Sequence, residues 1–355
     1  MVEEAARRGP LATDRARRPV TITDVARAAG VSKATVSYAL NGRPGVSDDT
    51  RALVLRLADE LGWTPSLRAR SISLSRAHAL GLVIERPAES MGDPFISRSM
   101  AGIQEVLEPL RRVLVVAMAS GEEAELETYR SLANDGRVDG FFLIDVREDD
   151  PRLPLLEDLG LPAVTLGPAD ATGDLVVGSD TEAALTEAIR MLIDLGHTRF
   201  ACVTGPARLM HTPHRIEVIA RTLREAGLPH PLVELGDYSA ASGGECMQRL
   251  LAHSDRPTAI IYANDVMAIG GMNMAGRLGY RLPAELSVVG MGDIELAAYV
   301  TPALTSIQSD AWAIGAEAAR RLLARVEPDF SSVPVAIPEP TLVRRASVGP
   351  APEHT

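Results

Sequence analysis

The chain is poor in lysine, cysteine and aromatic residues: it has one lysine, two cysteines and 4% aromatic side chains. Cys202 and Cys246 lie in separate apolar segments without a CxxC or Cys/His spacing. We therefore expect buried thiols in a reducing cytoplasm, with no disulfide and no zinc site. The longest apolar runs have strand length, well short of the roughly 20 residues that a membrane span needs. The polar N-terminus also lacks the apolar segment of a secretory signal, so we expect a cytoplasmic protein without membrane contact.

The charge of the chain is unevenly distributed. Residues 1–76 carry 13 basic and 8 acidic side chains, a net charge of +5, which leaves −16 for the remainder. A basic module on an acidic body indicates that a polyanion is met at one end only. Arg-rich tails are common, however, so the asymmetry alone does not establish a nucleic-acid partner.

A pattern of short helices begins at Thr21. Thr23 is expected to cap the first helix, which ends at Gly30, and Ser32 is expected to cap a second over residues 33–41. Two short helices joined by a Gly-containing turn indicate a helix-turn-helix, whose second helix normally lies in the DNA major groove. The open side of that helix is almost uncharged and rich in hydroxyls, which suits close approach to DNA. A three-helix packing module without DNA is the alternative.

A third helix is expected to brace this pair. Ser47 is its predicted cap and Gly62 its end, and Leu53, Leu57 and Leu61 are predicted to form its inner face.

Residues 20–72 read VTITDVARAAGVSKATVSYALNGRPGVSDDTRALVLRLADELGWTPSLRARSI. This segment resembles the N-terminal signature of the LacI/GalR family of bacterial transcriptional regulators. The resemblance implies that Lys33, Ala34 and Tyr38 read bases. Many members carry Arg or His where this chain has Tyr38, so base preferences do not transfer from relatives. The further DNA contacts of this domain are expected to be Thr23, Ser32, Thr35, Ser37 and Asn41.

The resemblance also implies a hinge helix over residues 66–77. In the family, two such helices fold together in the minor groove, where an apolar side chain wedges a base step. Ser66 is the expected cap, Ala69 and Arg70 match the motif, and Ile72 stands at the wedge position in place of Leu. A merely basic linker is the alternative, which would still favour nearby phosphates.

From about residue 78, strand-like and helical patterns alternate, which predicts an α/β fold with doubly wound parallel sheets. Roughly 270 residues exceed one such sheet, so we expect two lobes. The predicted strands are 79–84, 112–119, 139–145, 162–167, 199–205, 232–237, 258–263, 286–291 and 304–308. The predicted helices are 96–110, 122–134, 181–195, 214–226, 240–252, 266–278 and 310–325.

Two long segments, SDTEAALTEAIRMLIDLGHTRFACVTGP and ANDVMAIGGMNMAGRLGYRLPAELSVVGMGDIELAAYVTPALTSI, extend the resemblance over nearly all of this body. It implies a two-lobed, periplasmic-binding-protein-like effector domain. The predicted boundaries are a disordered tail (1–19), an all-α helix-turn-helix domain (20–65), a hinge (66–77), an effector and dimerisation domain (78–345) and a flexible tail (346–355). Within the effector domain we predict an N-lobe of about 78–178 plus 309–333 and a C-lobe of about 179–308 plus 334–345.

Ligands of open α/β sheets bind beyond the carboxyl ends of strands, which selects the candidate cleft residues. Arg215 matches the arginine that commonly holds effector oxygens in the family. Asp180, Asn264 and Asp265 are equally well read as helix caps. The full set is Arg86, Phe95, Asp180, Arg215, Asn264, Asp265, Gly292 and Asp293. His211 and His214 lack an acidic third ligand, so no metal site is expected, and no cofactor either.

Gly292 departs from the family pattern. Sugar-binding members usually read GFDD or GYDD where this chain reads VGMGD, so a carboxylate that commonly holds sugar hydroxyls is missing. Since unpaired hydroxyls would be costly, a simple hexose is disfavoured as the effector.

These features together predict a repressor that binds a pseudo-palindromic operator as a homodimer under the control of a small-molecule effector, sugar-like or another metabolite. An activator or corepressor-dependent regulator is the alternative within the family. A solute-binding protein without DNA activity would require a signal peptide and no helix-turn-helix. We expect no enzyme, because the sequence has neither a GxSxG elbow nor a phosphate-binding GxxxxGK[ST] loop.

Overall fold

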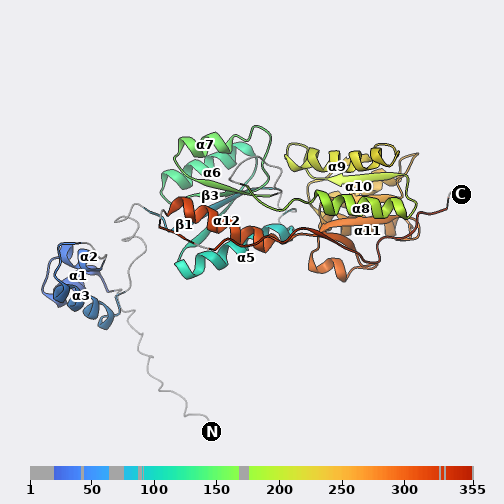
Figure 1. The fold of residues 1–355 in the computed structure, drawn as a ribbon. Helices are drawn as coiled ribbons and strands as arrows, with labels where there is room; N and C mark the ends of the chain where they lie inside the picture. The colour runs from blue at the N-terminus through green and yellow to red at the C-terminus, as the bar shows by residue number, and fades with distance from the viewer. Residues whose placement is uncertain are drawn as a thin grey trace, which may run out of the picture. The chain divides into compact units, whose positions relative to one another are not determined.

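The computed structural model describes residues 20–40, 44–63, 76–86, 90, 92–167, 176–327, 329–331 and 333–353. The chain divides into two compact units, residues 1–75 and 76–355, which are described separately (Figure 1). No helix in these described ranges is long and apolar enough to cross a membrane.

The described part of the first unit is a bundle of three helices: α1 (Ile22–Ala29), α2 (Lys33–Leu40) and α3 (Asp48–Glu60). Its core consists of small apolar side chains on the facing sides of the helices: Val25, Ala26, Val36, Ala39, Val54 and Ala58. Small side chains let three short helices approach closely, so this compact bundle presents most of its polar surface outward.

The helix ends differ from prediction at one point. The first helix begins at Ile22, so Thr23 lies inside it and the residue before the helix is Thr21. The Asp24 carboxylate accepts hydrogen bonds from the Thr21 backbone N–H at 2.9 Å and from the Thr21 hydroxyl at 2.6 Å. The predicted left-handed end at Gly30 (φ +66°) and the predicted cap at Ser47 are confirmed.

The inner face of α3 was also predicted wrongly. Val54 is fully buried and Ala58 nearly so, whereas Leu61 is 40% exposed and Leu53 and Leu57 are half-buried. Val54 and Ala58 stand four residues apart and so share a helix face, while each leucine stands one position before or three after one of them. The larger side chains therefore flank the small-residue core.

The second unit contains two sheets, and the first has the strand order β2-β1-β3-β4-β5 with every pairing parallel. Its strands are β1 (Ala79–Glu85), β2 (Val113–Ala119), β3 (Phe141–Leu143), β4 (Ala163–Leu166) and β5 (Val176–Val177). Helices α5 (Pro94–Leu107) and α12 (Ala311–Val326) cover one face, and α6 (Glu122–Asn134) and α7 (Arg152–Asp158) the other (Figure 1). A 3₁₀ turn, η2 (Glu108–Leu110), follows α5.

The second sheet has the order β11-β10-β9-β8-β6-β7, parallel except for the antiparallel edge strand β11. Its strands are β6 (Phe200–Thr204), β7 (Leu232–Leu235), β8 (Ala259–Tyr262), β9 (Ser287–Gly292), β10 (Thr305–Gln308) and β11 (Thr341–Val343). Helices α8 (Glu182–Asp194) and α9 (His211–Glu225) pack on one face, and α10 (Ala240–Leu251) and α11 (Asp265–Arg277) on the other. A short 3₁₀ turn, η3 (Glu295–Ala298), follows β9.

The doubly wound parallel architecture predicted from the sequence is confirmed, and every strand and helix predicted within residues 79–325 is present. Among the α-helices and strands of the described residues, α7, β5 and β11 were not predicted. β5 has two residues and β11 lies in a proline-rich, polar tail, so neither carries a periodic signal of its own. Pairing with β4 and β10 makes them strands.

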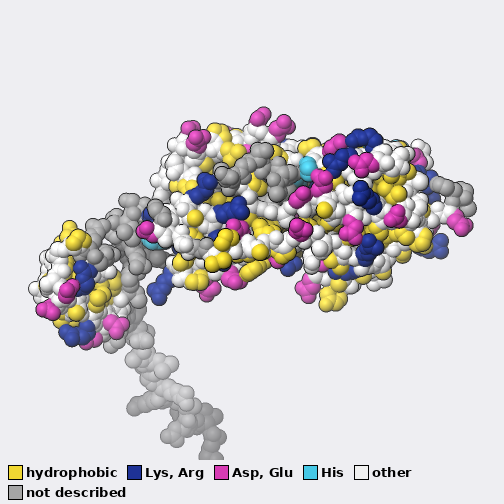
Figure 2. Space-filling model, in the orientation of Figure 1, with side chains coloured by type: hydrophobic (Ala, Val, Ile, Leu, Met, Phe, Trp, Pro, Cys, Tyr) yellow, Lys and Arg dark blue, Asp and Glu magenta, His cyan; other side chains and the backbone are white. Residues whose placement is uncertain are grey.

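The chain crosses between the two sheets three times: between β5 and α8, between β10 and α12, and between α12 and β11. Each sheet with its covering helices forms a lobe, named here the first lobe (β1–β5) and the second lobe (β6–β11). On the face drawn in Figure 2, acidic and basic side chains alternate with apolar ones over both lobes.

Candidate functional site

The outward face of α2 is a candidate nucleic-acid surface. Lys33 and Ala34 are exposed and Tyr38 is 42% exposed, while Val36 and Ala39 point into the bundle. Within the residues that the structure describes, the Lys33 ammonium has no hydrogen bond or ion pair. The first turn of α2 carries no acidic side chain that would repel a phosphate. This face therefore offers a mobile cation, a small side chain and a phenol to a partner.

The start of α2 is fixed by two hydroxyls. Ser32 Oγ accepts a hydrogen bond from the Thr35 backbone N–H at 3.0 Å and lies 2.9 Å from Thr35 Oγ1, which confirms the predicted cap. Ser37 and Thr23 are half-buried. Of the predicted DNA contacts, those that lie outside the described residues are Asn41, Ser66, Ala69, Arg70 and Ile72.

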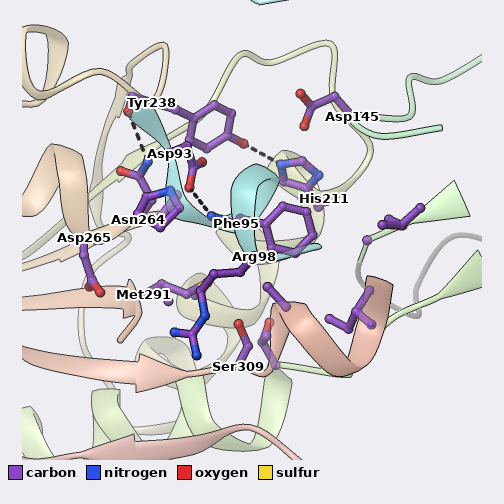
Figure 3. A pocket seen from close by; sticks show the side chains of 18 of the residues that line it. Asp93, Phe95, Arg98, Asp145, His211, Tyr238, Asn264, Asp265, Met291 and Ser309 are labelled. Atoms are coloured by element: carbon purple, nitrogen blue, oxygen red, sulfur yellow. Dashed lines mark hydrogen bonds between the residues drawn. The ribbon is translucent and has the colours of Figure 1, made fainter. Parts of the chain in front are cut away.

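A cleft opens in the second unit beyond the carboxyl ends of strands from both lobes (Figure 3). Its apolar wall includes Val146, Leu166, Met210, Met291 and Ile314. Of the effector contacts predicted from the sequence, it is lined by Arg86, Phe95, Arg215, Asn264, Asp265 and Gly292.

Arg86, directly after β1, is held by two carboxylates. Its Nε and Nη2 donate to Asp145 at 2.5 and 2.8 Å, and its Nη1 donates to Asp93 at 3.1 Å. Although burial acts in the opposite direction, Arg86 keeps the pKa of the Asp145 carboxyl below its ordinary value. The guanidinium also lies over the Tyr238 ring, 4.7 Å from its centroid. Three of the five guanidinium N–H donors of Arg86 are therefore engaged by the two carboxylates, and Arg86 shapes the cleft wall.

Tyr238 connects two further cleft residues. Its hydroxyl lies 2.5 Å from His211 Nε2, and its carbonyl accepts a hydrogen bond from Asn264 Nδ2 at 3.1 Å (Figure 3). Burial, together with the nearby Arg215 charge, lowers the pKa of the His211 imidazole to about 3. His211 is therefore neutral at physiological pH. Asn264 Oδ1 accepts a hydrogen bond from the Met267 N–H at 2.9 Å, so Asn264 caps α11. A helix cap was one of the two interpretations of this residue in the sequence.

The floor of the cleft is formed by Asp265 at the start of α11. Its carboxylate accepts from Ser306 Oγ at 2.6 Å and from the Ile294 N–H at 2.8 Å. Burial raises the pKa of the Asp265 carboxyl to about 6 despite these two hydrogen bonds. Beside it, Gly292 has φ +119°, a backbone conformation that favours glycine over an acidic residue.

Two arginines of the cleft have no hydrogen-bond or ion-pair partner in the described part of the chain. Arg215, on α9, has a buried Nε that makes no hydrogen bond. Arg98, on α5, is exposed at the cleft and forms no hydrogen bond or ion pair in the structure (Figure 3). A half-buried guanidinium without an acceptor is costly unless a ligand supplies one.

The structure places two predicted effector residues away from the cleft. Asp180 Oδ1 accepts from the Glu182 N–H at 2.8 Å, and the exposed side chain sits at the start of α8. Asp293 has φ +47° and turns toward Arg345, whose Nη2 lies 2.7 Å from Asp293 Oδ1. Both carboxylates are thus engaged in helix-end or tail contacts.

The predicted effector set lacks several polar residues that line the cleft, among them Asp93, Arg98, Asp145 and Tyr238. Asp145 and Tyr238 immediately follow or end predicted strands, so the strand-end rule applied to every strand would have found them. Asp93 and Arg98 belong to the first turns of α5, and only the tertiary fold brings them to the cleft.

No cluster of three His, Cys, Asp or Glu side chains suited to a metal ion occurs within the described ranges. His211 faces Tyr238, whereas His214 Nε2 lies 3.9 Å from Glu182 Oε2. The two imidazoles of the HxxH sequence therefore contact different partners.

Comparisons with known proteins match both parts of the chain. The family model described as "Bacterial regulatory proteins, lacI family" matches residues 21–66, and "Periplasmic binding protein-like domain" matches residues 189–348. The HTH-type transcriptional regulator AglR of Rhizobium meliloti (strain 1021) is 32% identical over 95% of this chain and 96% of its own length. The ribose operon repressor of Escherichia coli (strain K12) is also 32% identical, over 86% of this chain and 93% of its own. A crystal structure of the lac repressor dimer bound to operator and the anti-inducer ONPF superimposes with a TM-score of 0.77 at 28% identity, covering 94% of this chain and 100% of that one.

Proposed function

Since the chain belongs to the LacI family of bacterial regulatory proteins, we propose that it is a cytoplasmic transcriptional repressor controlled by a small-molecule effector. It binds a pseudo-palindromic operator as a homodimer, because two-fold symmetry in the protein is matched by two-fold symmetry in the DNA. The observation that carries the proposal is the pairing of an exposed helix-turn-helix face with a cleft that holds unpartnered arginines.

The DNA contacts of the repressor are made from the outward face of α2. Lys33, Ala34 and Tyr38 reach base edges, while the hydroxyls at the start of the helix meet phosphates. The hinge, proposed for residues 66–77, supplies the minor-groove contact with Ile72 as the wedge.

The homodimer uses the free edge of the first sheet. Strand β2 is the edge strand, and Val113, Val116 and Met118 on it are 51, 44 and 59% exposed. An apolar edge strand left open would be an aggregation hazard, so its burial against a second copy is favoured.

The effector binds in the cleft between the lobes and changes how the two lobes are arranged. Polar contacts already join the lobes beside the cleft: Met210 N–H donates to Val146 O at 2.9 Å, and Ser90 Oγ donates to Asp237 O at 2.7 Å. Arg208 Nη2 also lies 2.5 Å from Glu85 Oε2. A ligand that strengthens or breaks these contacts between the lobes changes the dimer interface. The coupling free energy between effector binding and operator binding is typically about 1–3 kcal/mol.

Binding-site selection with the full-length protein, followed by a thermal-shift screen of metabolites, tests this function. We expect one enriched pseudo-palindrome and at least one metabolite that changes operator affinity. Arg215→Ala should abolish the effector response while leaving ligand-free operator binding unchanged, because Arg215 lies in the cleft and outside the DNA-binding unit. Arg277→Ala removes an equal charge outside the cleft and serves as the control. A response retained in Arg215→Ala would remove this residue from the effector site.

A further inference from the structure

The charged side chains of the cleft are balanced in number but not in contacts. Three arginines and three aspartates line it: Arg86, Arg98, Arg215, Asp93, Asp145 and Asp265. What a ligand meets depends on which of these groups are already engaged by the protein. The contacts of each group therefore indicate the chemistry of the effector.

All three carboxylates are engaged. Asp145 receives two hydrogen bonds from Arg86. Asp93 accepts one from Arg86 through Oδ2 and one from the Phe95 N–H at 3.0 Å through Oδ1. Asp265 accepts from a side-chain hydroxyl and a backbone N–H. None of the three offers an oxygen without a protein donor to a ligand hydroxyl.

Two further acceptors that a neutral polyol could use are missing or engaged in the cleft wall. Gly292 has no side chain, and the neighbouring Asp293 is turned toward Arg345 at 2.7 Å. The Asn264 carbonyl oxygen is taken by the α11 N-terminus. A ring of sugar hydroxyls placed here would meet no carboxylate oxygen without a protein donor among the described residues. It would depend on the hydroxyls that line the cleft, which are Thr165, Ser179, Thr181 and Ser309.

The unengaged charges are both cations, and they come from opposite lobes. Arg98 belongs to α5 of the first lobe and Arg215 to α9 of the second, and both line the same cleft without a protein acceptor. Guanidinium groups prefer carboxylates and phosphates, which they bind through paired, charge-assisted hydrogen bonds. Phe95 and Met291 offer apolar surface for a carbon skeleton beside them.

We propose that the effector is a small organic anion, a carboxylate or a phosphate ester, whose acidic group is held by Arg98 of the first lobe and Arg215 of the second. The inference rests on the proposed function and names the chemical class of its effector. Because the two arginines come from different lobes, the anion ties the lobes together and favours their closure. Effector charge is thereby converted into a change in lobe arrangement.

Calorimetric titration of the full-length protein with matched probes tests the proposal. The probes are D-glucose 6-phosphate, D-gluconate and inorganic phosphate, with D-glucose as the neutral counterpart. At least one anion should bind, and D-glucose should bind at least about 10-fold more weakly, since hydrogen bonds to charged groups are the strong ones. Binding of D-glucose as tight as that of the anions, or no binding of any of the three anions, overturns the proposal.

Variants locate the binding. Arg98→Gln and Arg215→Gln should each weaken the anion about 10-fold or more, whereas Arg277→Gln should bind it as the wild type does. Equal affinity in all four proteins would mean that the anion binds elsewhere and would overturn the assignment.

A second measurement does not depend on the choice of probe. Without ligand, Arg215→Met should leave the unfolding temperature unchanged or raise it by about 2–4 °C, since it removes a buried donor that lacks an acceptor. Arg86→Met should lower it, because it removes both hydrogen bonds of Asp145 and one of the two of Asp93. A loss for Arg215→Met as large as that for Arg86→Met would show that Arg215 is structural.

Operator binding by the same protein preparations distinguishes a failure of the anion proposal from a failure of the proposed repressor function. If the wild-type protein selects an operator that a neutral sugar releases, the anion proposal fails and the repressor stands. If the protein selects no operator, the proposed function fails, and the calorimetry still decides the chemistry of the cleft.

Discussion

Among single residues, Lys33 has the most distinctive place, as the one lysine of the chain and an unpaired cation on the first turn of α2. Its compact ammonium on a flexible stem differs from the rigid fork of arginine and can follow a base edge or a phosphate. We expect Lys33→Ala to weaken operator binding by roughly 1–3 kcal/mol and to change the preferred bases, with the fold intact. Binding-site selection and circular dichroism measure the two effects.

The control for Lys33 is a charge-matched change elsewhere in the unit. Arg56 is exposed on α3, and Arg56→Ala should leave the selected sequence unchanged. Identical selected sequences for Lys33→Ala and the wild type would place Lys33 outside base reading.

His211 predicts a pH dependence of stability. Its pKa is lowered to about 3 in the folded protein by burial and by Arg215, whereas the unfolded chain titrates near 6.5. Between these values the unfolded state binds a proton that the folded state does not, so the stability present above pH 6.5 is lost as the pH falls toward 3. The slope from this group is at most about 1.4 kcal/mol per pH unit.

Replacement tests that assignment. His211→Gln should flatten the decline in the free energy of unfolding between pH 6.5 and pH 5, measured by urea titration, while His253→Gln at an exposed site should not. An unchanged slope in His211→Gln would assign the acid sensitivity to other groups.

At the scale of elements, two glycines of α11 have opposite roles. A Cβ on Gly270 would lie 1.9 Å from the Ala240 carbonyl oxygen of α10, so the close packing of these two helices requires glycine there. A Cβ on Gly276 would meet nothing within 4 Å. The same residue type is thus a packing requirement at one position and an entropic cost at the other.

Alanine substitution separates the two roles. Gly270→Ala should destabilise the protein by about 1–3 kcal/mol through overpacking, whereas Gly276→Ala should stabilise it by about 0.5–1 kcal/mol by favouring the helix. Thermal unfolding followed by circular dichroism measures both. Equal effects of the two substitutions would mean that the α10–α11 contact yields without cost.

On the scale of the whole molecule, the exposed edge of the first sheet predicts the assembly. Val116→Asp places a charge in the proposed dimer surface and should shift the protein toward monomer, since burying an unpaired carboxylate costs several kcal/mol. Sedimentation over a range of concentrations measures the equilibrium. Operator affinity should fall with it, because a monomer contacts one half-site.

The same change made on a loop provides the comparison. Val333 is 84% exposed and lies outside every strand and helix, so Val333→Asp should leave the dimer intact. A dimer that survives Val116→Asp would exclude β2 from the interface.

The sequence by itself determined the order and kind of the elements and the helix-turn-helix. Strand β8 is a short apolar run and helix α10 has helical periodicity, and both are local signals. Gly30 ends a helix and Ser47 starts one by backbone geometry that neighbouring residues specify. It also determined the strand ends, which is why Arg86, Asn264 and Gly292 were found at the cleft. The local signal was weak on the inner face of α3, where leucines were predicted to be buried and Val54 and Ala58 are buried instead.

Only the tertiary structure decided which side chains of the cleft are free. Arg86 was expected to contact an effector, yet three of its N–H donors are engaged by Asp145, which follows 59 residues later, and by Asp93. Arg98 had no sequence signal, yet it faces the cleft without a partner. Hydrogen bonding between distant segments sets what a binding site has left to offer, and no local pattern records those partners.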